Sequence, residues 1–311
     1  MKNILVTGGA GYIGATLVPM LLHQGYHVTV VDNFMYRQNS LAHVCHHDNL
    51  KLVKADIRRS DVLKSSLKDA DVIIPLAALV GAPICSQDPV GARSINRDAI
   101  LDLLKLASTN QLVIMPTTNS AYGSGDENNF CTEESELNPI SQYAIEKVEI
   151  EKTLMERENS ISFRLATVFG MSPRMRTDLL VNDFTYRAFN DRFIVLFESH
   201  FKRNYIHVID VARAMMHALD HYEKMKHNIF NVGLSSANLS KRELCEVIKS
   251  HIPQFTILES EIEKDTDQRN YIVSNEKLEN TGFKPAFTLD QGVQELIKGY
   301  AMIRDKVYCN V

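Results

Sequence analysis

The chain has 311 residues, 45 % of them hydrophobic and 23 % charged, which is the composition of a globular protein with a sizeable core. A formal net charge of −4 gives no electrostatic reason to expect binding to nucleic acid or to an anionic membrane. No apolar run reaches the roughly 18 residues of a membrane-spanning helix, and the first run starts at residue 4, which leaves no room for a signal sequence. We therefore expect a cytoplasmic protein. The five cysteines are widely spaced and form no CxxC pair, which favours reduced thiols over disulfides or a zinc site.

A glycine-rich turn at residues 7–14, with the sequence TGGAGYIG, follows the apolar run 4–6 and opens an amphipathic segment. This is the arrangement of a dinucleotide-binding unit, in which the backbone approaches a pyrophosphate and a helix packs tightly on a strand. Glycine is needed where a Cβ would prevent either approach, and it occurs at Gly8, Gly11 and Gly14. The helix predicted over residues 12–23 would direct its unpaired N–H groups at the phosphates.

The second apolar run, residues 28–31, ends at Asp32, 18 residues after Gly14. A carboxylate at this position accepts hydrogen bonds from the ribose hydroxyls of NAD and repels the 2′-phosphate of NADP. Arg37 lies five residues further on and could reach a 2′-phosphate, but we give the carboxylate more weight. The predicted cofactor is therefore NAD.

The first half of the sequence alternates short apolar runs with amphipathic segments. The runs lack polar alternation, which is typical of parallel strands covered on both faces, and they lie at residues 4–6, 28–31, 50–53, 72–76, 112–115 and 161–166. Helices are predicted at residues 12–23, 62–68, 96–107 and 142–158. The pattern predicts an α/β fold with a Rossmann-like, doubly wound parallel sheet. We expect residues 1–170 to form the NAD-binding domain and residues 171–311 to form mainly a smaller substrate-binding lobe, with some elements returning to the sheet.

Tyr143 and Lys147 are four residues apart on the predicted helix 142–158 and should share one face of it. A tyrosine with a pKa of about 10 is a weak base, but a neighbouring ammonium group stabilises the phenolate and lowers that pKa. Tyr143 could then take a proton from a sugar hydroxyl as hydride leaves the same carbon. Thr118 follows the predicted strand 112–115, at the strand end where ligands of such sheets bind, and could hydrogen-bond the reacting oxygen.

Together these motifs resemble the extended short-chain dehydrogenase/reductases that act on nucleotide sugars, and the resemblance runs nearly end to end. The matching segments are residues 7–14, 32–33, 56–58, 76–78, 118 with 122–123, 143 with 147, 163–170 and 203–208. The resemblance implies that NAD is bound by Gly8, Gly11, Tyr12, Ile13, Gly14, Asp32, Asn33, Asp56, Ile57, Leu76, Ala77, Ala78, Tyr143 and Lys147. It implies that a nucleotide-diphosphate sugar is bound by Thr118, Asn119, Ser120, Arg176, Asn182, Arg203 and Arg269. In this family, arginines matching Arg203 and Arg269 hold the substrate diphosphate, for which a bidentate guanidinium is suited.

Positions 119 and 120 discriminate among the reactions of this family. A 4,6-dehydratase carries an Asp-Glu pair there, because elimination of water needs an acid and a base, and a GDP-mannose 3,5-epimerase carries a cysteine at position 120. The chain has Asn119 and Ser120, which argues against both reactions. Redox chemistry at one carbon remains: a 4-dehydrogenase, a 4-ketoreductase, or a 4-epimerase that returns the hydride to the other face.

Four longer segments resemble bacterial GDP-mannoheptose C4-dehydrogenases of capsular heptose biosynthesis: residues 75–83, 118–123, 163–176 and 178–186. This resemblance implies oxidation of GDP-D-glycero-α-D-manno-heptose at C4 to a 4-keto sugar, with Tyr143 as general base. Hexose and deoxyhexose substrates would need only small changes in the pocket. A second class of function, a catalytically silent NAD-binding sensor or scaffold, also fits the fold, although such proteins usually lose the Tyr or the Lys.

The resemblance also implies a homodimer or a dimer of dimers, because family members usually pair the helix that carries the Tyr and Lys with the preceding long helix across a two-fold axis. We expect that interface to use Ile100, Leu103, Leu104, Ile145, Val148, Ile150 and Leu154.

Two further groups of residues could serve a site. His43, His46 and His47 have a spacing that a metal could use, but no fourth ligand pattern accompanies them, so we prefer a surface helix and predict no metal. Cys85 follows a predicted strand end and could line the substrate site, but a buried thiol is the more common role of a free cysteine.

Overall fold

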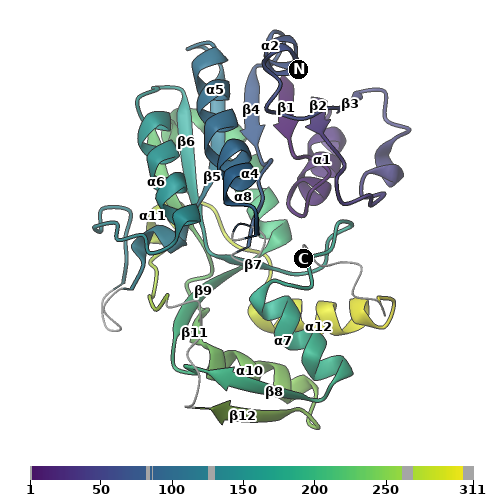
Figure 1. Ribbon diagram of the computed structural model, residues 1–311, viewed down its shortest axis with the longest axis vertical. Coiled ribbons are helices and arrows are strands. Elements are labelled where there is room, and N and C mark those ends of the chain that lie inside the picture. The colour runs from purple at the N-terminus through teal and green to yellow at the C-terminus, as the bar shows by residue number, and fades with distance from the viewer. Residues whose placement is uncertain (1, 82–84, 86, 125–129, 261–268, 304–311) are drawn as a thin grey trace.

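The computed structural model describes residues 2–81, 85, 87–124, 130–260 and 269–303. Its centre is a sheet of seven parallel strands in the order β10-β6-β5-β4-β1-β2-β3 (Figure 1). These strands are β1 (Asn3–Thr7), β2 (His27–Asp32), β3 (Leu50–Lys54), β4 (Val72–Pro75), β5 (Leu112–Thr118), β6 (Ser160–Leu165) and β10 (Asn228–Val232). The predicted doubly wound sheet is therefore confirmed.

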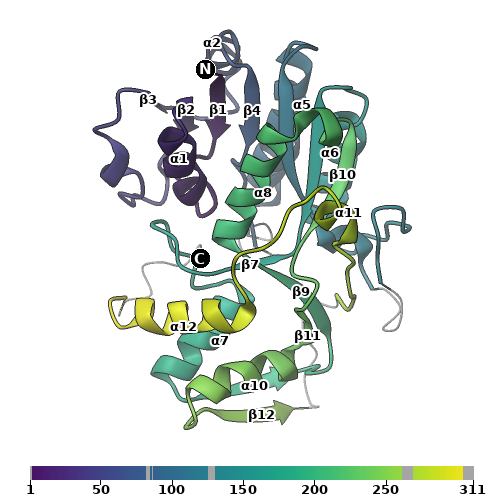
Figure 2. The same ribbon diagram turned by 180° about the vertical axis from the view of Figure 1, so that it is seen from behind.

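Different helices cover the two faces of the sheet, as Figures 1 and 2 show from opposite sides. One face carries α1 (Gly14–His23) and α8 (Val208–Asp220); the other carries α2 (Ser60–Leu67), α5 (Ala99–Leu106) and α6 (Gln142–Leu154). Each face has its own cluster of buried apolar side chains. Strands buried on both sides need apolar residues without alternation, which is why the runs in the sequence located them.

The strand order reverses at β1, because β2 and β3 lie on one side of it and β4, β5 and β6 on the other. In an open α/β sheet, ligands bind beyond the carboxyl ends of the strands at such a reversal. The glycine-rich turn directly after β1 is therefore placed where a cofactor is expected.

The second half of the chain contributes a smaller set of elements below the sheet in Figure 1. They include β7 (Thr167–Phe169), β9 (Lys202–His207) and β11 (Asn238–Ser240), which form one sheet, and the parallel pair β8 (Phe193–Phe197) and β12 (Thr256–Ser260). The helices among them are α7 (Leu180–Asn190), α10 (Lys241–His251) and α12 (Leu289–Tyr300), whereas α9 (Tyr222–Met225) packs against α8 and α11 (Glu276–Glu279) contacts β10 beside the large sheet. Two elements of this half, β10 and α8, join the large sheet, while the exact boundary at residue 170 stays a prediction.

Two predicted helices have different limits in the structure. The helix predicted over 96–107 continues an earlier one, because α4 (Pro89–Arg93) leads through a wide π turn at Ser94–Asp98 into α5. Helix α6 ends four residues before the predicted end at 158. There the chain turns toward β6, and the Arg157 guanidinium donates hydrogen bonds to carbonyl oxygens at the end of α5.

A membrane crossing would require a longer and more apolar helix than any that the structure describes. The described cysteines, Cys45, Cys85, Cys131 and Cys245, are all free thiols, and Cys309 lies outside the described residues.

Candidate active site

A pocket opens beyond the carboxyl ends of β1, β2 and β4, where the strand order reverses. Nine of the predicted cofactor-binding residues line it: Gly8, Gly11, Asp32, Asn33, Asp56, Ile57, Leu76, Ala77 and Ala78. They come from four separate segments of the sequence, so the fold assembles the predicted cofactor site in one place.

The glycine-rich turn fits the diphosphate of a dinucleotide. Gly8 has a φ of +69°, and a Cβ there would lie 2.5 Å from the backbone of Ala77. A Cβ on Gly14 would lie 2.5 Å from the carbonyl oxygen of Gly9. A Cβ on Gly11 would approach only the Gly8 carbonyl oxygen, at 3.1 Å, among the described atoms within 4 Å. Gly8 and Gly14 are therefore required by packing within the protein, whereas Gly11 leaves space on the pocket wall for the phosphates.

Tyr12, Ile13 and Gly14 are not among the residues that line the pocket. The buried Tyr12 hydroxyl donates to the Gly170 carbonyl oxygen at 2.6 Å and accepts from Asn182 Nδ2 at 3.3 Å. Asn182 is fully buried, and its Oδ1 accepts the Gly170 N–H at 3.0 Å. These bonds connect the glycine-rich turn with the second half of the chain. A direct contact of Asn182 with substrate stays a prediction, and it would require these hydrogen bonds to be exchanged.

Asp32, at the end of β2, presents a carboxylate that the backbone already holds. Its Oδ2 accepts the Ala10 N–H at 3.0 Å, and its Oδ1 accepts the Phe34 N–H at 2.8 Å. Burial raises the pKa of Asp32, while these two N–H groups and the charge of Arg174 act to lower it. The side chain of Arg37, the residue that could favour NADP, is exposed at the same pocket.

Asp32→Ala should weaken binding of NADH more than binding of NADPH, because only NADPH gains from the loss of charge repulsion. We expect the ratio of the two affinities to change by about tenfold or more in titrations of cofactor fluorescence. Asp32→Asn is the matched control, since it is neutral but keeps an oxygen acceptor for the backbone. An equal loss of affinity for both cofactors would contradict the assignment of Asp32 to the ribose.

Thr118 is the last residue of β5 and starts a tight 3₁₀ turn at Asn119–Tyr122. Its hydroxyl donates to Ser120 Oγ at 3.0 Å and accepts the Ser120 N–H at 3.1 Å. Ser120 Oγ also accepts a hydrogen bond from the Arg269 guanidinium. Asn119 is fully buried, and neither atom of its amide has a hydrogen-bond partner among the described residues. The turn thus brings Thr118, Ser120 and Arg269 together, as predicted for a substrate site.

Tyr143 and Lys147 lie one turn apart on α6, whose first turn is capped by Ser141 Oγ accepting the Ala144 N–H at 3.3 Å. Lys147 Nζ is 5.8 Å from the centroid of the Tyr143 ring. The Lys147 side chain is buried, so its charge is poorly hydrated. The two side chains are neighbours, as their spacing in the sequence requires.

The pKa values of this pair differ from the sequence-based prediction. Burial raises the pKa of Tyr143 from 10.0 to about 12, although the charges of Arg176 and Arg269 oppose the rise. Burial lowers the pKa of Lys147 from 10.5 to about 8, although the carboxylate of Glu146 opposes the fall. Tyr143 therefore does not have the lowered pKa that the sequence analysis expected, because desolvation by burial is the largest influence on that pKa.

The surroundings of Tyr143 include Cys85, for which the sequence analysis preferred a buried thiol over a place in the substrate site. Cys85 is partly exposed, its Sγ donates to the Leu79 carbonyl oxygen at 3.3 Å, and it contributes to the raised pKa of Tyr143. Leu79 lines the cofactor pocket, whereas Cys85 is not among the residues that line it. A place for Cys85 in the substrate site stays a prediction. Arg176, also next to Tyr143, forms an ion pair with Asp178.

Arg203 lies on β9 and is 2 % exposed. Its Nη1 donates to the Lys202 carbonyl oxygen at 2.8 Å, and its guanidinium is 5.7 Å from the centroid of the Tyr271 ring. Tyr271 in turn packs edge-on against Tyr122 of the turn after β5. A role for Arg203 in holding the substrate diphosphate stays a prediction.

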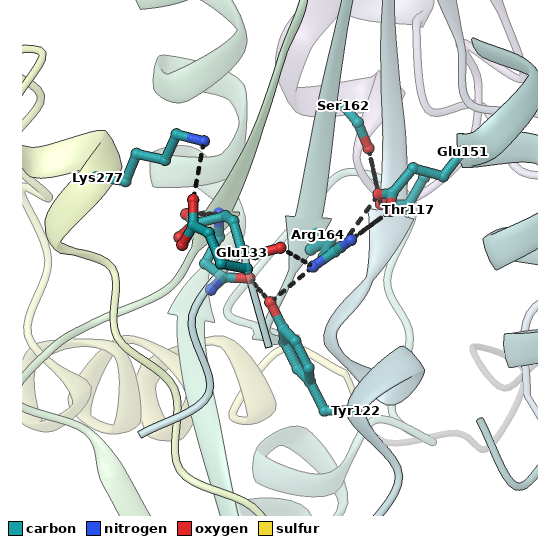
Figure 3. A network of polar contacts seen from close by, with 9 residues as sticks. Thr117, Tyr122, Glu133, Glu151, Ser162, Arg164 and Lys277 are labelled. Atoms are coloured by element: carbon teal, nitrogen blue, oxygen red, sulfur yellow. Dashed lines mark hydrogen bonds and ion pairs between the residues drawn. The ribbon is translucent and has the colours of Figure 1, made fainter. Parts of the chain in front are cut away.

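A buried polar network connects α6 with β5 and β6 (Figure 3). Its centre is the ion pair between Arg164 on β6 and Glu151 on α6, with a 2.6 Å separation and side chains that are 4 % and 5 % exposed. Glu151 follows Lys147 by one turn of α6 and also accepts from Ser162 Oγ at 2.7 Å and Thr117 Oγ1 at 3.0 Å. The Glu151 carboxylate therefore fixes α6 against β5, which carries Thr117, and against β6, which carries Ser162 and Arg164.

The other end of the network reaches the turn that carries Thr118. Arg164 donates to the Tyr122 hydroxyl at 3.0 Å, and Tyr122 donates to Asn231 Oδ1 on β10 at 2.7 Å (Figure 3). The helix that carries Tyr143 and the turn that follows Thr118 are thus joined by one network of hydrogen bonds. A buried ion pair adds little net stability, so we expect its main effect to be on geometry.

Glu151→Gln should lower both stability and turnover, because Arg164 then stays buried without a carboxylate. Breaking one partner of a buried ion pair typically costs about 3–5 kcal/mol. The double variant Glu151→Leu with Arg164→Met removes both charges and should recover most of the melting temperature. If the pair positions Tyr143, kcat of the double variant stays low although its stability returns. A double variant with wild-type kcat would restrict the pair to a role in stability.

Most of the apolar residues predicted for a dimer interface are buried within the chain itself. Ile100, Leu103, Leu104, Val148, Ile150 and Leu154 are buried, and only Ile145 of the seven is exposed, at 38 %. The assignment of the six buried residues to a subunit interface is therefore wrong, because they pack α5 and α6 against the sheet and against each other. The oligomeric state itself stays a prediction.

The histidines near residue 45 lie in a short 3₁₀ turn, Ala42–Val44, and the loop after it rather than in a surface helix. Across the described parts of the chain, no group of three or more His, Cys, Asp or Glu side chains is arranged to hold a metal ion.

Comparison with known proteins places these features in a family. The model of the NAD dependent epimerase/dehydratase family matches residues 4–233. A Methanocaldococcus jannaschii protein provisionally named UDP-glucose 4-epimerase is 27 % identical, over 94 % of this chain and 97 % of that protein. UDP-glucuronic acid decarboxylase 1 of Xenopus tropicalis is 25 % identical, over 95 % of this chain and 71 % of that protein.

A solved structure extends the comparison. UDP-glucose 4-epimerase of Thermotoga maritima with UDP-glucose superposes with a TM-score of 0.83 at 26 % identity, over 97 % of this chain and 99 % of that one. Relatives with different reactions are thus similar to this chain to about the same degree, and likeness alone does not select the reaction. The family model covers well over half of the sequence, and the chain therefore belongs to the NAD dependent epimerase/dehydratase family.

Proposed function

We propose that this protein oxidises C4 of a nucleotide-diphosphate sugar. The observation that carries the proposal is the place of Arg269, which hydrogen-bonds Ser120 beside Thr118 and whose charge also acts on Tyr143. Arg269 is thus connected through Ser120 Oγ to the Thr118 hydroxyl that can bind the sugar, so a substrate held by this arginine would be close to both Thr118 and Tyr143. Asn119 and Ser120 supply no acid–base pair for elimination or for proton abstraction from carbon, which favours redox chemistry at one carbon.

Each side chain has a separate task in this reaction. Tyr143, once ionised, takes the proton of the C4 hydroxyl, and Lys147 supplies a nearby positive charge that stabilises the phenolate. Thr118 donates a hydrogen bond to the oxygen as it becomes a carbonyl. NAD, when bound, accepts the hydride from C4. The Glu151–Arg164 network keeps Tyr143 and the Thr118 hydroxyl in fixed positions relative to each other.

The resemblance of residues 75–83 and 163–176 to GDP-mannoheptose C4-dehydrogenases makes GDP-D-glycero-α-D-manno-heptose the first substrate to test. A 4-epimerase is the second candidate, favoured by relatives in Methanocaldococcus jannaschii and Thermotoga maritima whose names contain UDP-glucose 4-epimerase. A 4-ketoreductase would use the same residues in reverse. A catalytically silent NAD sensor is disfavoured because Tyr143 and Lys147 are both present.

We further propose a cytoplasmic homodimer or dimer of dimers, on the resemblance to the family. Because most of the apolar residues of α5 and α6 are buried within the chain, the interface would depend on their outer polar faces. A monomer by light scattering at micromolar concentration would disprove this.

The experiment that tests the proposed reaction is incubation with a panel of GDP-, UDP- and dTDP-sugars, followed by NMR. A 4-keto product with stoichiometric NADH supports the dehydrogenase, and inversion at C4 without net NADH supports the epimerase. Binding of NADH without conversion of any sugar in the panel would favour the sensor.

A further inference from the structure

Tyr122 ends the tight turn that begins after Thr118, and its side chain is buried in the protein. Burial raises the pKa of its hydroxyl to about 12, although the charge of Arg164 opposes the rise. The hydroxyl is therefore a neutral group, which both donates and accepts a hydrogen bond at neutral pH. This side chain has no task in the proposed reaction.

On one side, the Tyr122 hydroxyl contacts the ion pair of α6. It accepts a hydrogen bond from Arg164 Nη1 at 3.0 Å, while Nε and Nη2 of the same guanidinium donate to the Glu151 carboxylate (Figure 3). The guanidinium also lies 5.3 Å from the centroid of the Tyr122 ring. Because Glu151 follows Lys147 by one turn of α6, a displacement of Arg164 would reach the helix that carries the base.

On its other side, the same hydroxyl is connected to the segment that follows Arg269. It donates to Asn231 Oδ1 on β10 at 2.7 Å, and Asn231 Nδ2 donates to the carbonyl oxygen of Ser274 at 3.1 Å. One hydroxyl group thus lies between the ion pair of α6 and the segment 270–275. A change in the position of either one would be felt at the other through Tyr122.

The ring of Tyr122 packs on the same segment. Its centroid is 6.2 Å from that of the Tyr271 ring, at an interplanar angle of 66°, and both rings belong to a small buried cluster with Cys131 and Val273. The Arg203 guanidinium lies 5.7 Å from the centroid of the Tyr271 ring. Tyr271 therefore joins Tyr122 to one of the arginines assigned to the substrate diphosphate.

The other of these arginines, Arg269, is bonded to the start of the turn that ends in Tyr122. Its guanidinium donates to Ser120 Oγ, which also accepts from the Thr118 hydroxyl at 3.0 Å. The turn is thus held at its start by Arg269 and at its end by Arg164. A ligand anion that drew the Arg269 guanidinium toward itself would shift the turn, and Tyr122 is the residue through which that shift would reach Arg164.

We propose that Tyr122 is a positioning residue, which couples binding of the substrate diphosphate to the orientation of α6. The inference rests on the proposed function, in which Arg203 and Arg269 hold the diphosphate and Tyr143 is the base. Binding energy from this remote part of the substrate would then be used to align the reacting groups, which raises kcat rather than affinity. Tyr122 acts through Arg164 and not on the reacting atoms.

Tyr122→Phe removes both hydrogen bonds of the hydroxyl and keeps the ring against Tyr271. It should lower kcat roughly tenfold and leave KM unchanged or lower, because binding energy is no longer used for alignment. In the Tyr122→Phe background, Arg269→Met should lower kcat by a smaller factor than in the wild type, since the coupling is already broken. Tyr205→Phe is the matched control: Tyr205 is also fully buried, but its hydroxyl has no hydrogen-bond partner among the described residues. Its kcat and KM should stay within about twofold of the wild type.

A second measurement needs no turnover. Amide hydrogen exchange of the NAD-loaded protein is followed with and without whichever of GDP, UDP and dTDP binds by calorimetry. Exchange of the α6 amides is taken relative to that of the α1 amides on the other face of the sheet, which removes the general stabilisation by a ligand. This relative exchange should slow roughly tenfold on binding in the wild type and in Tyr205→Phe, and less than about twofold in Tyr122→Phe.

Two results would overturn the coupling while the proposed function stands. One is an equal effect of Arg269→Met on kcat in both backgrounds, and the other is unchanged relative exchange of α6 with a nucleoside diphosphate bound. Failure of all three nucleoside diphosphates to bind would contradict the proposed substrate class and the coupling with it. Should the melting curve show that Tyr122→Phe does not fold, Asn231→Leu, which cuts the connection of Tyr122 to Ser274, takes its place in both measurements.

Discussion

Tyr143→Phe should lower the rate of sugar oxidation by roughly 10²- to 10⁴-fold. The substitution removes the hydroxyl that receives the substrate proton and keeps the packing of the ring. Affinity for NADH should change little, because Tyr143 is not among the residues that line the cofactor pocket. The rate is measured as NADH formation at saturating sugar, and the affinity by fluorescence titration of the same preparation.

The pH profile reports on the same group. Because burial raises the pKa of Tyr143 to about 12, the phenolate that oxidation needs is scarce at neutral pH. Oxidation should therefore become faster as the pH rises through the alkaline range, and this rise should be absent in Tyr143→Phe. The positive nicotinamide of bound NAD should lower the apparent pKa below 12. Near wild-type turnover of Tyr143→Phe on a sugar shown to be oxidised at C4 would exclude Tyr143 as the base.

Lys147→Met should reduce oxidation further than Tyr143→Phe, on the order of 10⁴-fold or more. It removes the buried positive charge beside the base and, on the resemblance to the family, a contact to the nicotinamide ribose. NADH should therefore bind more weakly in this variant, in contrast to Tyr143→Phe. Lys147→Arg is the matched control, since it keeps the charge in a larger side chain. Wild-type kcat in Lys147→Met would show that this charge is not needed.

The same substitution should stabilise the folded protein at neutral pH. A lysine whose pKa falls from 10.5 in the unfolded chain to about 8 in the folded one costs about 3 kcal/mol while both states are protonated, that is, below pH 8. The folded chain loses this proton first as the pH rises, so the cost fades between pH 8 and 10.5. The melting temperature of Lys147→Met should exceed that of the wild type at pH 7, and the difference should shrink toward pH 10.5.

The sequence predicted which segments meet at the pocket, because the placement of these segments depends on local features. The turn at 7–14 needs glycine for reasons that neighbouring residues impose, and Asp32 is placed simply by being the last residue of β2. The same holds for Tyr143 and Lys147, which share a face of α6 by helical spacing alone.

Features that depend on burial could not be predicted in this way. The apolar face of α5 gave no sign of whether it meets another subunit or its own sheet, and the raised pKa of Tyr143 follows from desolvation by segments distant in sequence. Arg174 could not be told from Arg176, because two arginines two residues apart look alike until the fold places one over the Tyr36 ring and pairs the other with Asp178.

The return of β10 and α8 to the large sheet means that the molecule is not divisible at its apparent midpoint. A fragment ending at residue 170 would leave the backbone of β6 without its β10 partner and would expose the apolar side of α1 on which α8 packs. It would also lose the residue that hydrogen-bonds the Tyr12 hydroxyl from α7. The large sheet is therefore completed only by the second half of the chain, and neither half is expected to be gained, lost or exchanged as an independent module.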